Sequence, residues 1–165
     1  MELYFLRHAI AAESGDFEGK DSSRPLTEEG VEKMKKAAKG MKNLKIEPDA
    51  VLSSPYVRAA HTAEIVSRTL GFTHPIQYEN CLIPSGSPKE LLKLLRNFPV
   101  TSRLLLVGHQ PSLGEFVSTL VFGQTVLSVD FKKGGLCRVD LPKPEAGVLG
   151  ELKWLLTNAQ LRDLA

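Results

Sequence analysis

Two residues that could do chemistry end the first apolar stretch of the chain. The segment Glu2–Ala9 runs as an apolar strand directly into Arg7 and His8. Packing in the core does not explain why a buried strand ends in two polar, ionisable residues. Binding of an anion and reaction with it would explain them. An imidazole is a nucleophile, and a guanidinium binds two oxygens of one phosphate. We therefore expect His8 to attack a phosphoryl group at the carboxyl end of this strand.

Two later segments place further ionisable residues in comparable positions. Arg58 follows the predicted strand 49–53, and His109 ends the most apolar stretch, 103–109. Helices are expected to start beside both residues, and the free amide groups of helix starts also attract anions. Together with the Arg7–His8 pair, these residues predict a cage for one phosphate group.

The chain has no sequence signature of a metal or nucleotide site beside this cage. It contains no DxD, HxH, HExxH or GxxxxGK pattern. We therefore expect no metal and no cofactor, and a covalent route in which a phosphohistidine forms on His8 and is then hydrolysed. Arg7 and Arg58 would lower the pKa of His8 and favour its neutral, attacking form.

Alternating apolar and amphipathic segments predict the elements that position these residues. Strands are expected at 2–7, 49–53, 75–78 and 103–109 and, in the tail, at 126–131, 136–141 and 151–156, with 132–135 as a hairpin link. Helices are expected to open at Thr27, Ser54, Ser87 and Gln110. The pattern predicts one domain, 1–165, folded as a three-layer α/β/α sandwich with a mixed, mostly parallel sheet. The carboxyl ends of its parallel strands would meet in one crevice.

Composition and charge narrow the class of protein. The 165 residues are 42% hydrophobic and 24% charged, and the net charge of +2 is too small to predict a nucleic-acid partner. No apolar run reaches the roughly 20 residues of a membrane span, and no signal peptide is recognisable. Cys81 and Cys137 are expected to be free thiols. These features predict a cytoplasmic protein with no membrane partner.

A row of lysines marks one side of the helix that Thr27 opens. The row comprises Lys33, Lys35, Lys36, Lys39 and Lys42. It fits a solvated helix face, and it also fits a docking surface for an acidic protein.

The motifs around the cage resemble those of a known family. Leu6–Ala9, Ser53–Ala63 and Val107–His109 are similar to the RHG, SSPxxRAxxTA and second-histidine segments of the histidine phosphatase (phosphoglycerate-mutase-like) superfamily. Arg24–Thr27 and Gly108–Pro111 resemble the SixA-type phosphohistidine phosphatases within it. The resemblance implies that His8 is the nucleophile and that Arg7, Arg58 and His109 bind phosphate. It also implies that Arg24 lines the pocket.

Two departures from the family pattern bear on the substrate. Ala9 replaces the usual glycine, and the place of the usual acidic proton donor falls near Leu82, with Glu79 as the nearest acid. The spacing leaves no room for the helical lid of larger relatives. An imidazole leaving group needs less protonation than an alkoxide, so a phosphohistidine on a phosphotransfer protein is the expected substrate. The acids of the loop 9–26 remain candidate proton donors: Glu13, Asp16, Glu18 and Asp21.

Other functions fit the same residues. A small-molecule phosphomonoesterase could use the same pocket, and an acid from the loop 9–26 over the crevice would favour it. A phosphoglycerate mutase fits less well because the acid and the lid are missing. A phosphate- or phosphoprotein-binding module without turnover is the alternative from another class, and the complete set of Arg7, His8, Arg58 and His109 argues against it.

Overall fold

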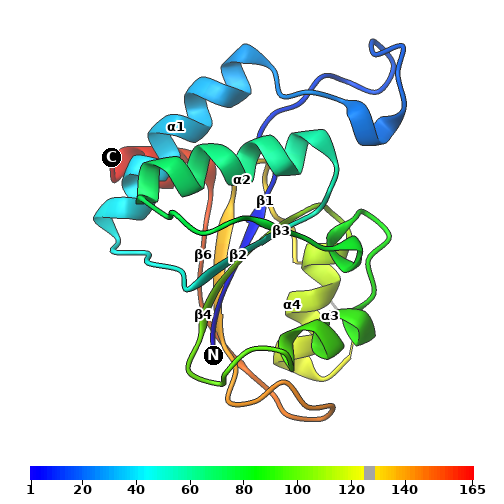
Figure 1. The fold of residues 1–165 in the computed structure, drawn as a ribbon, viewed down its shortest axis with the longest axis vertical. Coiled ribbons are helices and arrows are strands. Elements are labelled where there is room, and N and C mark those ends of the chain that lie inside the picture. Colours follow the sequence, from blue (N-terminus) through cyan, green and yellow to red (C-terminus); the bar gives the residue numbers. More distant parts are fainter. Residues whose placement is uncertain (125–128) are drawn as a thin grey trace.

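The computed structural model describes residues 1–124 and 129–165, which form one mixed sheet covered by helices on both faces (Figure 1). The strands are β1 (Glu2–Arg7), β2 (Ala50–Ser53), β3 (Gln77–Tyr78), β4 (Arg103–Gly108), β5 (Leu136–Asp140) and β6 (Glu151–Leu156). The helices are α1 (Glu28–Asn43), α2 (Val57–Leu70), α3 (Pro88–Leu95), α4 (Ser112–Phe122) and α5 (Asn158–Asp163), with short 3-10 turns η1 (Asp21–Ser23) and η2 (Asn80–Leu82). The predicted three-layer α/β/α fold is confirmed.

The first strand lies inside the sheet, whose order is β3-β2-β4-β1-β5-β6. β1 pairs with β4 in parallel and with β5 in antiparallel orientation. Its side chains alternate between two cores: Tyr4 and Leu6 pack with α1 and α2, and Leu3 and Phe5 pack with α3 and α4. Because both faces are covered, the strand reads as a continuous apolar run.

The carboxyl ends of β1, β2 and β4 meet at one edge of the sheet. The main-chain N–H of His8 donates to the carbonyl of Gly108 at 3.0 Å, and that of Ser54 donates to Val107 at 2.9 Å. These bonds continue the strand ladders by one residue beyond each strand. They hold the segments after the three strands side by side, and the loop 9–26 extends from the same edge (Figure 1).

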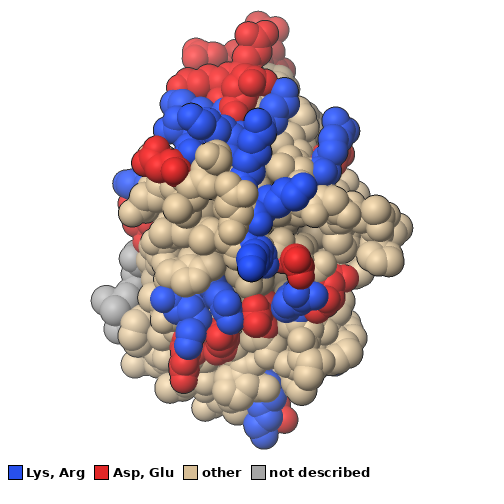
Figure 2. Space-filling view, turned by 90° about the vertical axis from the view of Figure 1, so that its left-hand side faces the viewer, with Lys and Arg blue, Asp and Glu red and all other residues tan. Residues whose placement is uncertain are grey.

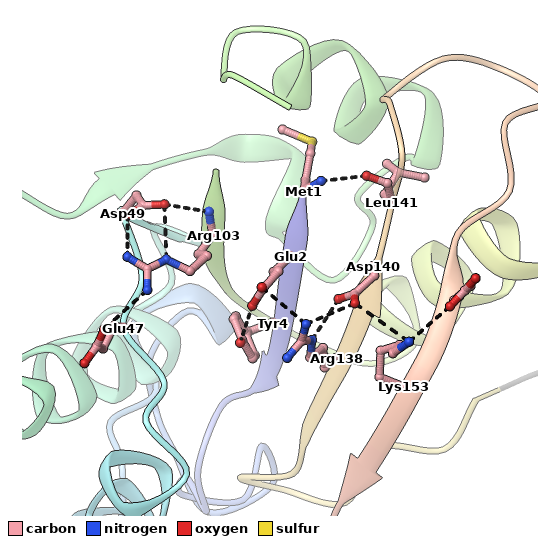
Figure 3. Close-up of polar contacts among 11 residues, drawn as sticks. Met1, Glu2, Tyr4, Glu47, Asp49, Arg103, Arg138, Asp140, Leu141 and Lys153 are labelled. Carbon is pink, nitrogen blue, oxygen red and sulfur yellow. Dashed lines mark hydrogen bonds and ion pairs between the residues drawn. The ribbon is translucent and has the colours of Figure 1, made fainter. Parts of the chain in front are cut away.

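The opposite edge of the sheet carries charges that pair with one another (Figure 3). Arg103 of β4 binds Asp49 at 2.9 Å and Glu47 at 3.3 Å. Arg138 of β5 lies 2.7 Å from Asp140 and 3.3 Å from Glu2. The charges at this end of the strands thus neutralise one another. The edge where β1, β2 and β4 end is the one for which the sequence predicts a cluster of cations.

Several predicted boundaries were wrong. The helices predicted to open at Ser54 and Gln110 begin at Val57 and Ser112, because the segments between carry site residues. Residues 129–131 are not in a strand, and 126–128 of that predicted strand lie outside the described residues. Residues 132–135 therefore form a turn against the end of β1 and not a hairpin link. Helix α5 was not predicted.

Candidate active site

A cavity of about 350 Å³ lies where β1, β4 and the start of α2 meet the loop 9–26. All five residues predicted for the site line it: Arg7, His8, Arg24, Arg58 and His109. The remaining lining residues are Ala11, Glu13, Ser14, Asp21, Pro84, Gln110 and Lys133. Four lining side chains are cations, Arg7, Arg24, Arg58 and Lys133, and two are carboxylates, Glu13 and Asp21, so the cavity carries an excess of positive charge.

Hydrogen bonds define which nitrogen of His8 carries the proton. Its Nδ1 lies 2.7 Å from the carbonyl oxygen of Ala9, which can only accept, so Nδ1 carries the hydrogen. Nε of Arg58, which can only donate, lies 3.3 Å from His8 Nε2. Nε2 therefore keeps its lone pair. The ring is a neutral imidazole, and the lone pair of its Nε2 accepts a hydrogen bond from Nε of Arg58.

The environment of His8 keeps it neutral. Burial lowers its pKa to about 3, and the charges of Arg58, Arg7 and Lys133 act in the same direction, while the bond to Ala9 opposes them. At neutral pH the lone pair of Nε2 is thus available for attack on phosphorus.

His109 faces His8 with 5.0 Å between the ring centroids. Its Nε2 lies 2.9 Å from the Ser54 hydroxyl, which already accepts from the N–H of Tyr56. A hydroxyl can donate to Nε2 or accept from it, so this contact holds the ring in place in either tautomer. The buried Nδ1 of His109 has no hydrogen-bond partner among the described residues. Burial, followed by the effect of His8, lowers the pKa of His109 to about 2.

Arg58 is buried although it is charged, with 3% of its side chain exposed. Its Nη1 and Nη2 donate to the main-chain carbonyl and the carboxylate of Asp21, at 2.6 and 3.1 Å. Its guanidinium also lies 5.1 Å from the ring centroid of Tyr56, a cation–π distance. Burial lowers the pKa of Arg58, and Asp21 opposes this effect. The guanidinium is therefore fixed beside His8 before any ligand binds.

Arg24 reaches the cavity from the loop 9–26. Its Nε lies 2.8 Å from the Asp21 carboxylate, and its Nη1 donates to the carbonyl of Ala12 at 2.6 Å. The base of the loop is closed by a bridge between Ala11 and Leu26. One carboxylate thus holds two arginines at the same side of the cavity, and the hydrogen bonds to Arg58 and Arg24 lower the pKa of Asp21 against its partial burial.

Arg7 is held by the turn that follows the undescribed residues. Its Nη1 donates to the carbonyl of Phe131 at 2.5 Å. The N–H of Gly134 contacts the carbonyls of Arg7 and His8 at 3.2 and 3.0 Å, and Gly135 accepts from the N–H of Arg7 at 3.0 Å. The turn 132–135 therefore supports the end of β1, which carries Arg7 and His8.

The segment near Leu82, where the family pattern places an acidic proton donor, supplies no acid to the cavity. Leu82 is fully buried in the core, and the residue of this segment that reaches the cavity is Pro84. Among the described residues, the acids that line the cavity are Glu13 and Asp21. Glu13 lies 3.2 Å from Lys133, so both acids have cationic partners. Ala9 has no positive φ and is not strained.

Comparisons with known proteins match this geometry. A model of the histidine phosphatase superfamily (branch 1) matches residues 3–83. An uncharacterized protein of Picosynechococcus sp. is 37% identical over 166 residues, 94% of this chain and 99% of its own. Phosphohistidine phosphatase SixA of Escherichia coli (strain K12) is 33% identical over 128 residues, 76% of this chain and 77% of that protein. The chain belongs to the histidine phosphatase superfamily.

A solved structure refines this assignment. The protein histidine phosphatase SixA complexed with tungstate superposes with a TM-score of 0.86 at 26% identity, over 98% of this chain and 99% of the other. The chain is a phosphatase of the SixA type, which confirms the resemblance of its motifs. None of the described helices is long and apolar enough to cross a membrane.

Sequence reasoning missed the contacts that orient the site residues. Asp21 was expected only as a proton donor, and its role as partner of two arginines has no local signature because it lies 37 residues from Arg58. Ser54 was predicted as a helix cap, but its hydroxyl contacts His109. Lys133 and the carbonyl of Phe131 come from a segment whose sequence pattern was read as strand and hairpin.

Proposed function

We propose that this phosphatase removes phosphate from a phosphohistidine on a protein through a covalent intermediate on His8. The observation that carries the proposal is the tautomer of His8: its Nδ1 hydrogen is fixed by Ala9, and its Nε2 lone pair lies beside Arg58. Such a nitrogen is already prepared for attack on a phosphoryl group that arginines hold in place.

The reaction proceeds in two displacements. In the first, Nε2 of His8 forms a bond to phosphorus while the P–N bond to the substrate histidine breaks. The electron pair of that bond stays on the substrate imidazole, which takes a proton from water. In the second, a water oxygen bonds to phosphorus, the P–Nε2 bond breaks with its electron pair returning to Nε2, the proton of that water passes to solvent in place of the one taken in the first step, and inorganic phosphate leaves. The hydrogen stays on Nδ1 of His8 throughout and is donated to the carbonyl of Ala9.

The cations around His8 bind the phosphoryl oxygens in this scheme. Arg7, Arg58 and Arg24 supply guanidinium groups, and Nδ1 of His109, which has no partner among the described residues, supplies a further donor in the tautomer that protonates it. Their charges offset the negative charge of the equatorial oxygens, which is the main requirement of phosphoryl transfer. No step in the scheme requires a metal ion or another cofactor.

The state of the acids supports phosphohistidine over a phosphate ester. An alkoxide leaving group needs a proton from a nearby acid. Asp21 is held ionised by Arg58 and Arg24, which lower its pKa, and Glu13 is paired with Lys133. An imidazole leaves without such help. We infer that the partner is a phosphotransfer protein and that the enzyme acts in signalling in the cytoplasm, where its two cysteines would stay free thiols.

The test compares wild type with His8→Ala and with His74→Ala, which alters an exposed histidine away from the cavity. The substrates are a histidine phosphotransfer domain phosphorylated by phosphoramidate and a set of small phosphate esters. We expect turnover of the phosphoprotein, and an acid-labile, base-stable phosphoenzyme, in wild type and His74→Ala only. Equal turnover by His8→Ala would remove His8 as the nucleophile. Fast ester cleavage with no action on phosphohistidine would reject the substrate.

Glu13 favours a second candidate, a small-molecule phosphomonoesterase. It lines the cavity, and its side chain is 70% exposed beside Lys133, which is 36% exposed. A substrate phosphate that attracts Lys133 would free the Glu13 carboxylate to take a proton from water and pass it to an alcohol leaving group. The ester series in the same experiment distinguishes this candidate from the first.

A further inference from the structure

A second, larger hollow lies away from the candidate active site, between α1, α2 and α5. It has a volume of about 790 Å³. Lys36 and Lys39 of α1, Arg68 of α2 and Arg162 of α5 line it, and Ile65 and Thr69 of α2 provide less polar surface. We call this hollow the basic groove. It contains part of the lysine row that the sequence pattern left open as a docking surface.

The cations of the basic groove are largely unneutralised. Among the described residues, none forms an ion pair with Lys36, Lys39 or Arg68. The groove's Glu32 is bound by Lys35 at 2.7 Å. Figure 2 shows a band of lysine and arginine side chains on the upper half of the face it draws, below a cluster of acids at the top, whereas lower on the face basic and acidic side chains alternate. The groove thus presents positive charge that the protein itself does not use.

A third hollow joins the basic groove to the active site. It shares Lys33 and Arg162 with the groove, and it shares Arg7 and Lys133 with the cavity around His8. Lys132 lines it as well. Lys33, Lys132 and Lys133 along it are ion-paired with Glu29, Asp130 and Glu13, whereas Arg7 and Arg162 form no ion pair among the described residues. A surface of mixed charge with two unpaired arginines therefore leads from the predicted nucleophile, past the end of β1, onto α1 and α5.

We propose that the basic groove docks an acidic surface of the protein that carries the phosphohistidine. This inference rests on the proposed function and extends it: the cavity holds the phosphorylated side chain, and the groove holds the fold around it. Charge complementarity of this kind mainly accelerates encounter and selects the partner. The groove would then explain how a pocket that recognises only a phosphoryl group discriminates among phosphoproteins.

Two features favour a protein over nucleic acid or a membrane as the occupant. Ile65, a core residue with 9% of its surface exposed, forms an apolar floor among the cations, as in protein interfaces, which combine an apolar centre with a polar rim. Glu28 and Glu29 in the first turn of α1 add acidic side chains at one end of the same helix. An extended polyanion such as a nucleic acid would run past the groove and be repelled by these acids. A compact acidic patch on a protein would contact the groove alone.

The experiment neutralises or reverses the two exposed lysines of α1. Lys36→Gln/Lys39→Gln and Lys36→Glu/Lys39→Glu are compared with Lys89→Glu/Lys93→Glu, which changes two exposed lysines of α3 on the opposite face of the sheet. Each protein is assayed with a phosphorylated acidic histidine phosphotransfer domain and with the amino acid phosphohistidine, at 25 and 500 mM salt. The amino acid reaches only the cavity and reports that the site is intact.

We expect kcat/KM on the phosphoprotein to fall about tenfold in the glutamine variant at low salt, and further in the glutamate variant, with most of the loss in KM. The loss should shrink to about twofold at high salt, because salt screens the charges. The amino acid should react as in wild type, and the α3 variant should match wild type on both substrates.

Three outcomes would overturn the docking proposal. If the groove variants lose no more phosphoprotein turnover than the α3 variant, docking at the groove is rejected and the proposed function is kept. Loss of binding to a DNA duplex or to phosphatidylserine vesicles, with phosphoprotein turnover unchanged, would assign the groove to another anion. Failure of wild type to act on the phosphoprotein would reject the proposed function and the docking with it.

Discussion

Asp21 binds both terminal nitrogens of Arg58. Its main-chain carbonyl accepts from Nη1 at 2.6 Å, and its carboxylate accepts from Nη2 at 3.1 Å. The donors that we propose for phosphate are therefore occupied by a residue of the loop 9–26 when the site is empty. A phosphate ion must replace at least one of these bonds, so Asp21 competes with the ligand for the guanidinium.

The Asp21→Asn variant tests this competition. The amide keeps the shape of the side chain but removes a negative charge beside the phosphate site. We expect inorganic phosphate to inhibit the variant about two- to fivefold more tightly, because a half-exposed charge contributes on the order of 1 kcal/mol or less after screening. Titration calorimetry with phosphate or tungstate measures the change. Asp16→Asn, in the same loop but not lining the cavity, is the control. Weaker binding would show that Asp21 chiefly orients Arg58.

Glu13 offers a way to separate ester from phosphohistidine chemistry. Removing its proton with Glu13→Gln should lower kcat on phosphate esters by about 10- to 100-fold, as expected for a general acid. The effect on phosphohistidine should be about threefold at most, because the imidazole leaves without protonation by the enzyme. Steady-state kinetics on both substrates give the ratio, with Glu18→Gln as a control outside the cavity lining. Equal losses on both substrates would contradict a role in protonation.

The two buried histidines should make folding stability depend on pH. In the folded protein burial lowers the pKa of His8 to about 3 and that of His109 to about 2, against about 6.5 when unfolded. Below pH 6.5 the unfolded chain binds more protons, so stability falls as the pH drops from 6.5 toward 3. Each histidine should remove roughly 2 kcal/mol between pH 6.5 and 5.

Urea unfolding at pH 7.5, 6 and 5 checks this dependence. His8→Asn should lose less stability on acidification than wild type, because it takes up one proton fewer on unfolding. His74→Asn alters an exposed histidine and should follow the wild-type curve. A wild-type slope that His8→Asn leaves unchanged would mean that other groups cause the acid sensitivity.

Gly40 lies where α5 crosses α1. A Cβ at this position would be 1.8 Å from the carbonyl oxygen of Leu161, which is main chain and cannot swing away. Gly40→Ala should therefore destabilise the fold by about 2 kcal/mol or more, although alanine favours a helix by about 1 kcal/mol. The midpoint of urea unfolding measures it. Gly15→Ala, which meets no atom within 4 Å, is the matched control, and an equal midpoint in both variants would contradict the close contact.

The elements that carry the site were predictable because their signals are local. β1 and β4 are apolar runs buried on both faces, and Thr27 caps α1 through a bond from Gly30 as its position predicts. Helix α5 was missed because it has only six residues, yet its capping box of Thr157 and Gln160 was a usable signal. The helix starts at Val57 and Ser112 lie two or three residues after the predicted ones, although Gln110 still caps α4 because its side chain accepts from the N–H of Gly114.

The positions of Arg7, His8, Arg58 and His109 followed from the parallel sheet, since strand ends meet at one edge. The orientation of these side chains did not follow. It depends on main-chain carbonyls, such as those of Ala9 and Phe131, and on a contact between Asp21 and Arg58 across 37 residues. Every residue has a main-chain carbonyl, so the residue types do not show which carbonyl will accept a hydrogen bond from a site residue. The tautomer of His8 therefore needed the structure.

The place of β1 inside the sheet has a consequence for the nascent chain. In this chain β1 is synthesised before both of its neighbours, β4 and β5, and α1, β2, α2 and α3 all come between β1 and β4. The turn 132–135 that braces Arg7 and His8 emerges later still than β4. The end of β1 thus stays unpaired until β4 has been made. A chain interrupted before this turn would carry every residue of the phosphate cage and yet have no assembled site, so phosphatase activity reports that synthesis has passed the turn 132–135.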